Sequence, residues 1–189
     1  MNHPNCDYFK FIDGITPEIK GLYMSLEYLN IKLDNSNKDL IKQNDIYITY
    51  PSGPGSIIKM RLNKEEQIRR LIVIDKTMII QFLKFDYKEI AAAILHEVGH
   101  FLNKPPDDQK NDKEFYADDF ARKCGLENEL KSGFVKYINE IEKYSDPSIG
   151  RSFFNDINEQ NQIIKLFNDR ISRIRNDSPF LVGSIENGT

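Results

Sequence analysis

Cysteine is scarce in this sequence. The chain has only Cys6 and Cys124 among its 189 residues, and these lie too far apart to supply a disulfide framework or the paired cysteines of a zinc knuckle. We expect both thiols to be reduced. A catalytic role for Cys124 is disfavoured because no histidine stands near it in the sequence.

Long apolar runs and a strong excess of charge of one sign are also missing. The longest apolar passages, such as residues 91–95, fall far short of the ~18 residues that cross a bilayer. The start of the chain lacks the basic and apolar regions of an export signal. The formal net charge of -3 gives no basic field that would gather nucleic acid. We therefore expect a soluble, cytoplasmic protein with no membrane and no nucleic-acid partner.

What the sequence does contain is the composition of an ordinary globular protein. Hydrophobic residues make up 40% of the chain and charged residues 29%, and a chain of this length can bury a core around an active site. We expect a single domain over residues 1–176. Residues 177–189 mix Pro, Gly, Ser and Asn without a period, so they are expected to form a flexible tail.

The first half of the chain predicts a helix and a small sheet. Thr16 and Pro17 favour a helix start, and that helix is expected to run to about Leu29. The polar residues 34–38 are expected to form a turn. β-branched and aromatic residues predict strands at 46–50, 57–62 and 71–74. We expect their sheet to be antiparallel at least in part.

The second half of the chain predicts helices. Asp86 begins a capping box, and the apolar run after it predicts a helix to about Leu102. Residues 103–111 contain prolines that allow a reversal, and a second helix is expected from about Asp112 to Gly125. Apolar residues three and four apart predict two further helices, within residues 130–141 and 163–174. The expected fold class is therefore α+β, with a small N-terminal β-sheet packed on a helical bundle.

The segment His96 to His100 spells H-E-x-x-H within the first of these helices. Residues four apart on a helix project in nearly the same direction, so both imidazoles can approach one metal ion with Glu97 beside it. Zinc accepts histidine nitrogens and a carboxylate oxygen, and a catalytic site keeps its fourth position for water. The motif therefore predicts one bound zinc ion with Glu97 as the general base, and it requires a third ligand.

Two carboxylates on the following helix can supply that ligand. Glu114 and Asp118 are four residues apart and share a face, so one can bind the metal while the other orients a histidine through its second ring nitrogen. We assign Glu114 to the metal and Asp118 to the histidine, and the reverse assignment stays open. Glu114 could instead complete a capping box with Asn111. Asp119 is expected to be a solvated surface residue.

These residues resemble the gluzincin metallopeptidases, in which H-E-x-x-H on one helix is completed by the glutamate of E-x-x-x-D on a later helix. The run Glu114, Ala117, Asp118, Phe120 and Ala121 is similar to the E-x-x-A-D-x-F-A run of the HtpX-type and CAAX-processing proteases, especially their small soluble phage-type relatives. ImmA/IrrE-type peptidases carry a similar helix pair. The resemblance covers residues 88–125 and implies a zincin-like metallopeptidase domain.

The chain departs from the HtpX-type group in two respects. It lacks the hydrophobic spans of the membrane members, and it lacks their later histidine-proline element, since its only other histidine is His3. The donor that stabilises the oxyanion is therefore open. Arg170, Arg151 and Tyr116 are the candidates.

The resemblance implies a zinc-dependent peptidase in which Glu97 assists the attack of a zinc-bound water on a peptide or protein substrate. Two alternatives stay open: a catalytically inactive zinc-binding module that recruits a protein partner, and a regulatory peptidase dedicated to one protein partner. The intact Glu97 argues against the first. We also expect an extended substrate to pair with a free sheet edge near His96.

Overall fold

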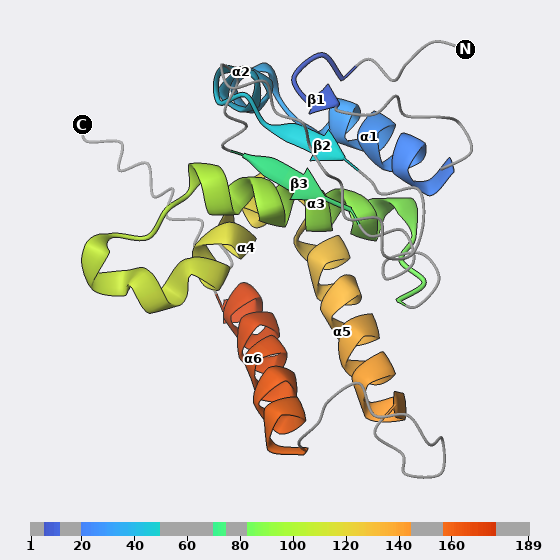
Figure 1. Ribbon diagram of the computed structural model, residues 1–189, viewed down its shortest axis with the longest axis vertical. Coiled ribbons are helices and arrows are strands. Elements are labelled where there is room, and N and C mark those ends of the chain that lie inside the picture. Colours follow the sequence, from blue (N-terminus) through green and yellow to red (C-terminus); the bar gives the residue numbers. More distant parts are fainter. Residues whose placement is uncertain (1–5, 12–19, 50–69, 75–82, 145–156, 177–189) are drawn as a thin grey trace, which may run out of the picture.

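The structure is a computed structural model that describes residues 6–11, 20–49, 70–74, 83–144 and 157–176 (Figure 1). Within these residues the chain forms a three-stranded sheet and is otherwise mostly helical, so the expected α+β class is confirmed. The strands are β1 (Lys10–Phe11), β2 (Tyr47–Thr49) and β3 (Leu71–Val73). The helices are α1 (Lys20–Lys32), α2 (Asn35–Gln43), α3 (Tyr87–Leu102), the 3-10 helix η2 (Asp107–Asp112), α4 (Lys113–Lys123), α5 (Glu127–Tyr144) and α6 (Ile157–Asn176).

The three strands of the sheet are parallel and lie in the order β1, β2, β3. Lys10 pairs with Tyr47, which pairs in turn with Leu71. The expectation of a partly antiparallel sheet is therefore wrong for these strands. Parallel neighbours require a long crossover connection, and α1 and α2 lie within the connection between β1 and β2. Strand-forming residues predict where a strand lies but not which way it runs.

The two N-terminal helices differ in how well the sequence predicts them. In α1 the predicted apolar face is buried, with Leu22, Leu26 and Leu29 at most 1% exposed. Residues 34–38, expected to be a turn, instead begin α2. The Asp34 side chain accepts a hydrogen bond from the Asn37 amide at 2.7 Å and so caps this helix. The sequence of α2 shows no repeat of apolar residues, because Ile41 is the buried side chain of a nine-residue helix that is otherwise polar or exposed.

Helix α3 lies in the middle of the molecule, between the sheet and the C-terminal helices (Figure 1). It packs against α1, α4, α5 and β3, and Ile90, Leu95 and Val98 are at most 1% exposed. The predicted capping box is present: Asp86 Oδ1 accepts from the Glu89 amide at 3.0 Å, and Glu89 Oε2 accepts from the Asp86 amide at 2.8 Å. The capping box and the apolar run therefore correctly predict where α3 begins and which face it buries.

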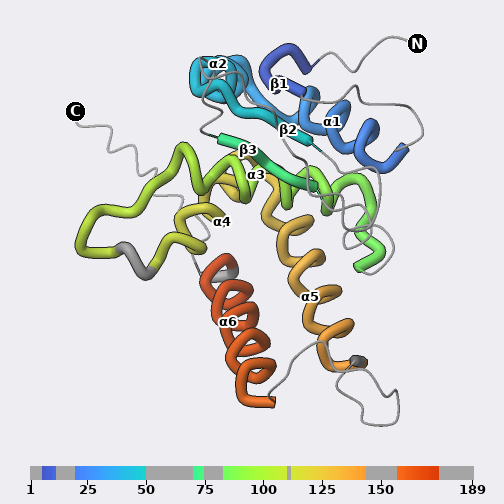
Figure 2. Tube along the Cα trace, in the orientation of Figure 1, coloured from blue at the N-terminus to red at the C-terminus, as the bar shows by residue number. Residues whose placement is uncertain are grey.

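The last three helices follow the predicted order. Helix α4 comes after the reversal that contains η2, and it ends before Gly125, whose φ of +76° suits glycine. Helix α6 packs along α5 and also contacts α4, and Figure 2 shows α5 and α6 extending together away from α3. The predicted stripe of α5 is buried, at 8% exposure or less, and consists of Leu130, Phe134, Ile138 and Ile141.

The remaining predictions fall partly on described residues. Cys6 and Cys124 are free and buried, as expected, and burial raises the pKa of each thiol to about 11. None of the described helices combines the length and the hydropathy needed to span a membrane. Other predicted features lie outside the described residues: the helix start at 16–17, the strand at 57–62, Arg151, and the tail at 177–189. The pairing of a substrate with a free sheet edge near His96 stays a prediction.

Candidate metal centre

The candidate site depends on a close approach of α3 and α4. A Cβ atom on Gly99 would lie 2.6 Å from the Ala117 carbonyl oxygen, so only glycine lets the two backbones come this close. Asn103, at the end of α3, donates from Nδ2 to the Tyr116 carbonyl oxygen at 2.7 Å. The feature of the sequence that points to this contact is Gly99 itself. Glycine inside a helix lowers helix stability by ~1 kcal/mol relative to alanine, so its presence there needs a structural reason. The spacing of the motif alone does not predict it.

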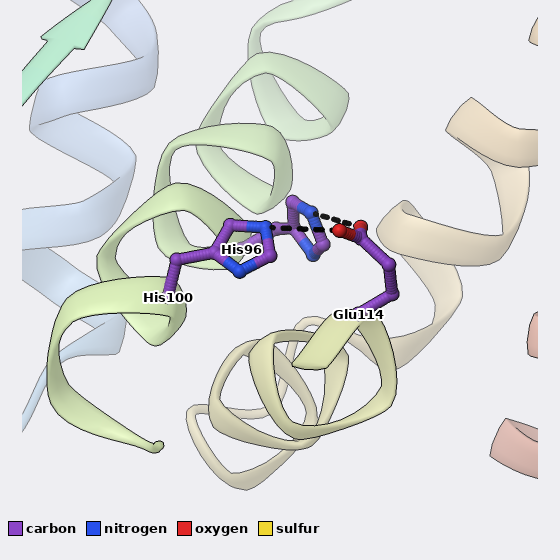
Figure 3. A group of neighbouring side chains, drawn as sticks. All are labelled: His96, His100 and Glu114. Carbon is purple, nitrogen blue, oxygen red and sulfur yellow. Dashed lines mark ion pairs between the residues drawn. The ribbon is translucent and has the colours of Figure 1, made fainter. Parts of the chain in front are cut away.

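This approach brings His96, His100 and Glu114 together (Figure 3). One ligand atom from each residue lies within 4.8 Å of the others. His96 Nε2 is 3.4 Å from Glu114 Oε2, and His100 Nε2 is 3.6 Å from Glu114 Oε1. Figure 3 shows the two imidazoles of α3 directed at the carboxylate of α4. The structure therefore places three of the predicted site residues in one cluster.

The donor set of this cluster fits zinc. Ligand atoms ~2.0–2.1 Å from a tetrahedral ion stand about 3.4 Å from one another. The histidines lie 3.4 and 3.6 Å from the two different oxygens of Glu114, and one ligand atom from each residue lies within 4.8 Å of the others. Two imidazole nitrogens and one carboxylate oxygen also leave a fourth position open, as catalytic zinc sites do. Magnesium and calcium prefer ligand sets made of oxygen, so the two histidines favour zinc or another transition metal over these ions.

Asp118 lies behind His96, on the side away from the cluster centre. Its Oδ1 is 2.8 Å from His96 Nδ1, and its side chain is 3% exposed. When Nδ1 carries the proton and donates it to Asp118, Nε2 is left free to bind a metal. The two carboxylates thus take different positions, and the geometry favours the assignment of Glu114 to the metal over its reverse.

Arg170 of α6 pairs with Asp118 and also approaches His96, with Nη2 lying 3.2 Å from His96 Nδ1. Its Nε and Nη2 donate to Asp118 Oδ2 and Oδ1 at 2.7 and 2.6 Å, a bidentate pair. The guanidinium stacks on the Phe134 ring, 4.2 Å from its centre, and Nη1 lies 3.5 Å from Glu114 Oε2. Arg170 is 4% exposed. These contacts give Arg170 a positioning role that the sequence does not predict.

The contacts of the other two oxyanion candidates do not bear on that role. Tyr116 donates its hydroxyl to Gln109 Oε1 at 2.7 Å, and Arg151 lies outside the described residues. The oxyanion role of Arg170, Arg151 or Tyr116 stays a prediction. A donor for the oxyanion has to face the reacting carbonyl, which requires a bound substrate.

The alternative role of Glu114 as a helix cap is wrong. Asp112 occupies the N-cap position of α4, one residue later than a capping box between Asn111 and Glu114 requires. Asp119, expected to be a solvated residue, is 28% exposed and pairs with two cationic side chains of its own helix. Glu114 is therefore available to bind a metal, and Asp119 is occupied by its own ion pairs.

The electrostatics of the cluster favour the metal-binding forms of Glu114 and His100, whereas the raised pKa of His96 opposes metal binding at that ring. The hydrogen bond from His96 outweighs the opposing effect of burial and lowers the pKa of Glu114 to about 2. Burial, reinforced by the charge of His96, lowers the pKa of His100. Burial also acts to lower the pKa of His96, but the hydrogen bonds to Asp118 and Glu114 outweigh it and leave that pKa raised. At neutral pH Glu114 is therefore ionised and His100 is neutral, the forms that bind metals.

Glu97 stands next to the cluster and is exposed. Together with His96 and Arg170 it borders a cavity of about 340 Å³ between α3, α5 and α6. That volume lies within the range of ~300–1,000 Å³ that is usual for pockets binding small ligands. The predicted base therefore adjoins both the metal-ligand cluster and a space that part of a substrate can occupy.

Comparisons of the chain with protein-family models, with curated proteins and with solved structures found no significant match. What can be said of function therefore rests on the chemistry of the described residues.

Proposed function

We propose that this chain is a zinc-dependent peptidase. In this proposal His96, His100 and Glu114 hold one zinc ion, and Glu97 is the general base. The observation that carries it is the convergence of three ligand atoms, from two helices, within 4.8 Å of one another. Its supporting features are the hydrogen bond that orients His96 and the position of the exposed Glu97 beside a cavity.

The residues have the chemistry that peptide hydrolysis needs. A zinc ion, when bound, would lower the pKa of water towards ~7 and polarise the carbonyl of the scissile bond. Glu97 takes a proton from the attacking water and delivers it to the leaving amine as the C–N bond breaks. Asp118 keeps the His96 ring in the orientation and tautomer that ligation requires.

The family assignment is part of the same proposal. The pairing of H-E-x-x-H on α3 with Glu114 and Asp118 on α4 supports a zincin-like domain of the gluzincin type that resembles the HtpX-like peptidases or, as second choice, the ImmA/IrrE-type peptidases. A peptide or protein substrate and a cytoplasmic location belong to this proposal as well. The buried, unpaired thiols are compatible with a reducing compartment.

Zinc content and peptide cleavage, measured together, test the proposal. We expect about one equivalent of zinc in the purified protein by elemental analysis, and cleavage of a mixed-sequence peptide library detected by mass spectrometry. Glu97→Gln should keep the zinc and lose the cleavage, because it removes the base and leaves every ligand in place. His100→Ala should lose both.

Three results would change the proposal. Zinc at one equivalent with no cleavage of any peptide or protein would favour the inactive zinc-binding module. Cleavage of a single protein partner, with the peptide library left intact, would favour the dedicated regulatory peptidase. Cleavage that persists in Glu97→Gln would remove Glu97 from the mechanism.

A further inference from the structure

The cavity beside Glu97 has an apolar wall. Its sides come from α5 and α6 and from the residues that precede α3. The apolar side chains that line it are Leu83, Phe85, Leu130, Phe134, Tyr137 and Phe167. The Tyr137 and Phe167 rings contact each other at a tilt of 44° with their centres 4.7 Å apart, and Phe134 and Phe167 meet edge to face at 5.1 Å. The far side of the cavity is therefore built for an apolar group.

Apart from Glu97, the acidic and basic residues that border this cavity are engaged with neighbours. Glu89 accepts hydrogen bonds from Ser132 and Lys136, each at 2.5 Å. Glu129 accepts from the Tyr28 hydroxyl at 2.8 Å, and Arg170 is bound to Asp118 by two hydrogen bonds. A charged side chain that reached Glu89, Glu129 or Arg170 would have to compete with these pairs, whereas an apolar side chain would not.

Two small residues determine how much of the cavity is open. Ala93 stands one turn before Glu97 on the same side of α3 and lines the cavity with its methyl group. Gly133 lines it from α5, and a Cβ atom there would lie 3.3 Å from the Phe85 ring. A larger side chain at either position would fill space that is now open beside the predicted base.

From these observations we propose that the cavity is a specificity pocket, which takes a large apolar side chain of the residue next to the cleaved bond and whose size is set by Ala93 and Gly133. This inference rests on the proposed peptidase function for its substrate. An aromatic or branched aliphatic side chain held in the cavity lies beside Glu97, so its own backbone is brought towards the metal ligands. Peptides with a charged or very small residue at that position are poor substrates.

Cleavage preference tests the pocket directly. With a mixed peptide library, wild-type protein is expected to cut next to Phe, Leu, Ile or Met on one side of the bond. Ala93→Leu should lower kcat/KM for the preferred residue by about tenfold or more, since one methylene in an apolar pocket already changes it ~10- to 200-fold. The loss should be clearly smaller for peptides with Ala at that position, so the ratio of Phe to Ala cleavage falls, and the variant should keep its zinc.

The matched control is Val135→Leu, which adds bulk on the outer face of α5, where Val135 is 44% exposed. It should leave both zinc content and preference unchanged. Tyr137→Ala changes the pocket in the other direction and should broaden the preference towards larger side chains. The pocket proposal is overturned if cleavage shows no apolar preference on either side of the bond, or if Ala93→Leu leaves the ratio of Phe to Ala cleavage unchanged.

A binding measurement separates failure of the pocket from failure of the peptidase proposal. N-acetylphenylalaninamide and N-acetylglycinamide are compared as probes by saturation-transfer NMR. We expect the phenylalanine probe to bind wild type and Val135→Leu, and to bind Ala93→Leu at least about tenfold more weakly. If no peptide is cut but this pattern holds, the peptidase proposal fails and the pocket stands. If the probe does not bind, or binds Ala93→Leu equally well, the pocket proposal fails whatever the cleavage results.

Discussion

At the scale of single residues, the candidate site depends on how two carboxylates of α4 divide their partners. Glu114 faces both imidazoles, whereas Asp118 is shared between His96 Nδ1 and the Arg170 guanidinium. A spacing of four predicts that the two carboxylates share a face. Local spacing does not predict the pairing of Arg170 with Asp118, because the two residues are 52 positions apart in the sequence.

Asp118→Asn tests the charge that His96 and Arg170 share. We expect zinc affinity to fall about 10- to 100-fold, because the ring of His96 loses its anionic partner. The free energy of unfolding should fall by ~3–5 kcal/mol, because the buried charge of Arg170 loses its bidentate ionised partner and is left with Glu114, at 3.5 Å, as its ionised neighbour. Competition with a chromophoric chelator measures the affinity, and urea unfolding measures the stability.

Asp119→Asn is the matched control for that variant. Asp119 is the next residue of the same helix, but its partners are Arg122 and Lys123 near the surface. Its replacement should change stability by less than ~1 kcal/mol and leave zinc affinity as it is. Equal losses of zinc affinity in the two variants would mean that Asp118 has no particular role in orienting His96.

At the scale of helices and strands, the sequence predicts those elements that have a recognisable capping motif or a periodic apolar face. The capping box begins α3 where the sequence predicts it, and periodic apolar residues mark α1, α5 and α6. Helix α2 escapes prediction because a single buried residue, Ile41, gives no period. Strand direction cannot be predicted from the residues of a strand, because it depends on the connection that joins one strand to the next. The close contact of α3 and α4 is likewise a tertiary feature, made at Gly99.

Gly99→Ala tests that contact. Alanine gains about 1 kcal/mol of helix propensity over glycine, but its Cβ would lie 2.6 Å from a backbone oxygen of α4 that cannot move alone. Overpacking of this kind costs ~1–3 kcal/mol and moves Glu114 away from the histidines. We expect lower stability by urea unfolding and weaker zinc binding by chelator competition.

Gly133→Ala provides the comparison within α5. Its added Cβ meets the Phe85 ring at 3.3 Å, and a ring can shift by a few tenths of an ångström where a backbone cannot. The gain in helix propensity then roughly offsets the contact, so stability and zinc affinity should stay near wild type. A Gly99→Ala protein as stable and as tight for zinc as Gly133→Ala would refute the close approach.

At the scale of the whole molecule, the site joins parts of the chain that fold into different elements. Helix α3 supplies both histidines and Glu97, α4 supplies Glu114 and Asp118, and α6 supplies Arg170. The sequence predicts the contribution of the first two helices, because motif and spacing lie within one stretch. It names Arg170 of α6 only as an oxyanion candidate and does not predict its pairing with Asp118, or the cavity that α5 and α6 form with α3.

A ligand that bridges α3 and α4 must stabilise the fold that brings them together. Zinc at about 100 times its dissociation constant adds ~2.7 kcal/mol, and for a chain of this size each 1 kcal/mol raises Tm by ~2–4 °C. We therefore expect zinc to raise Tm by about 5–10 °C in differential scanning fluorimetry, and EDTA to reverse the rise. Magnesium at the same excess should have little effect, because two of the three ligands are imidazoles. His100→Ala should lose the rise, since it removes one ligand and leaves the buried core intact. An equal rise in His100→Ala would place the zinc elsewhere on the protein and remove the physical basis of the proposed site.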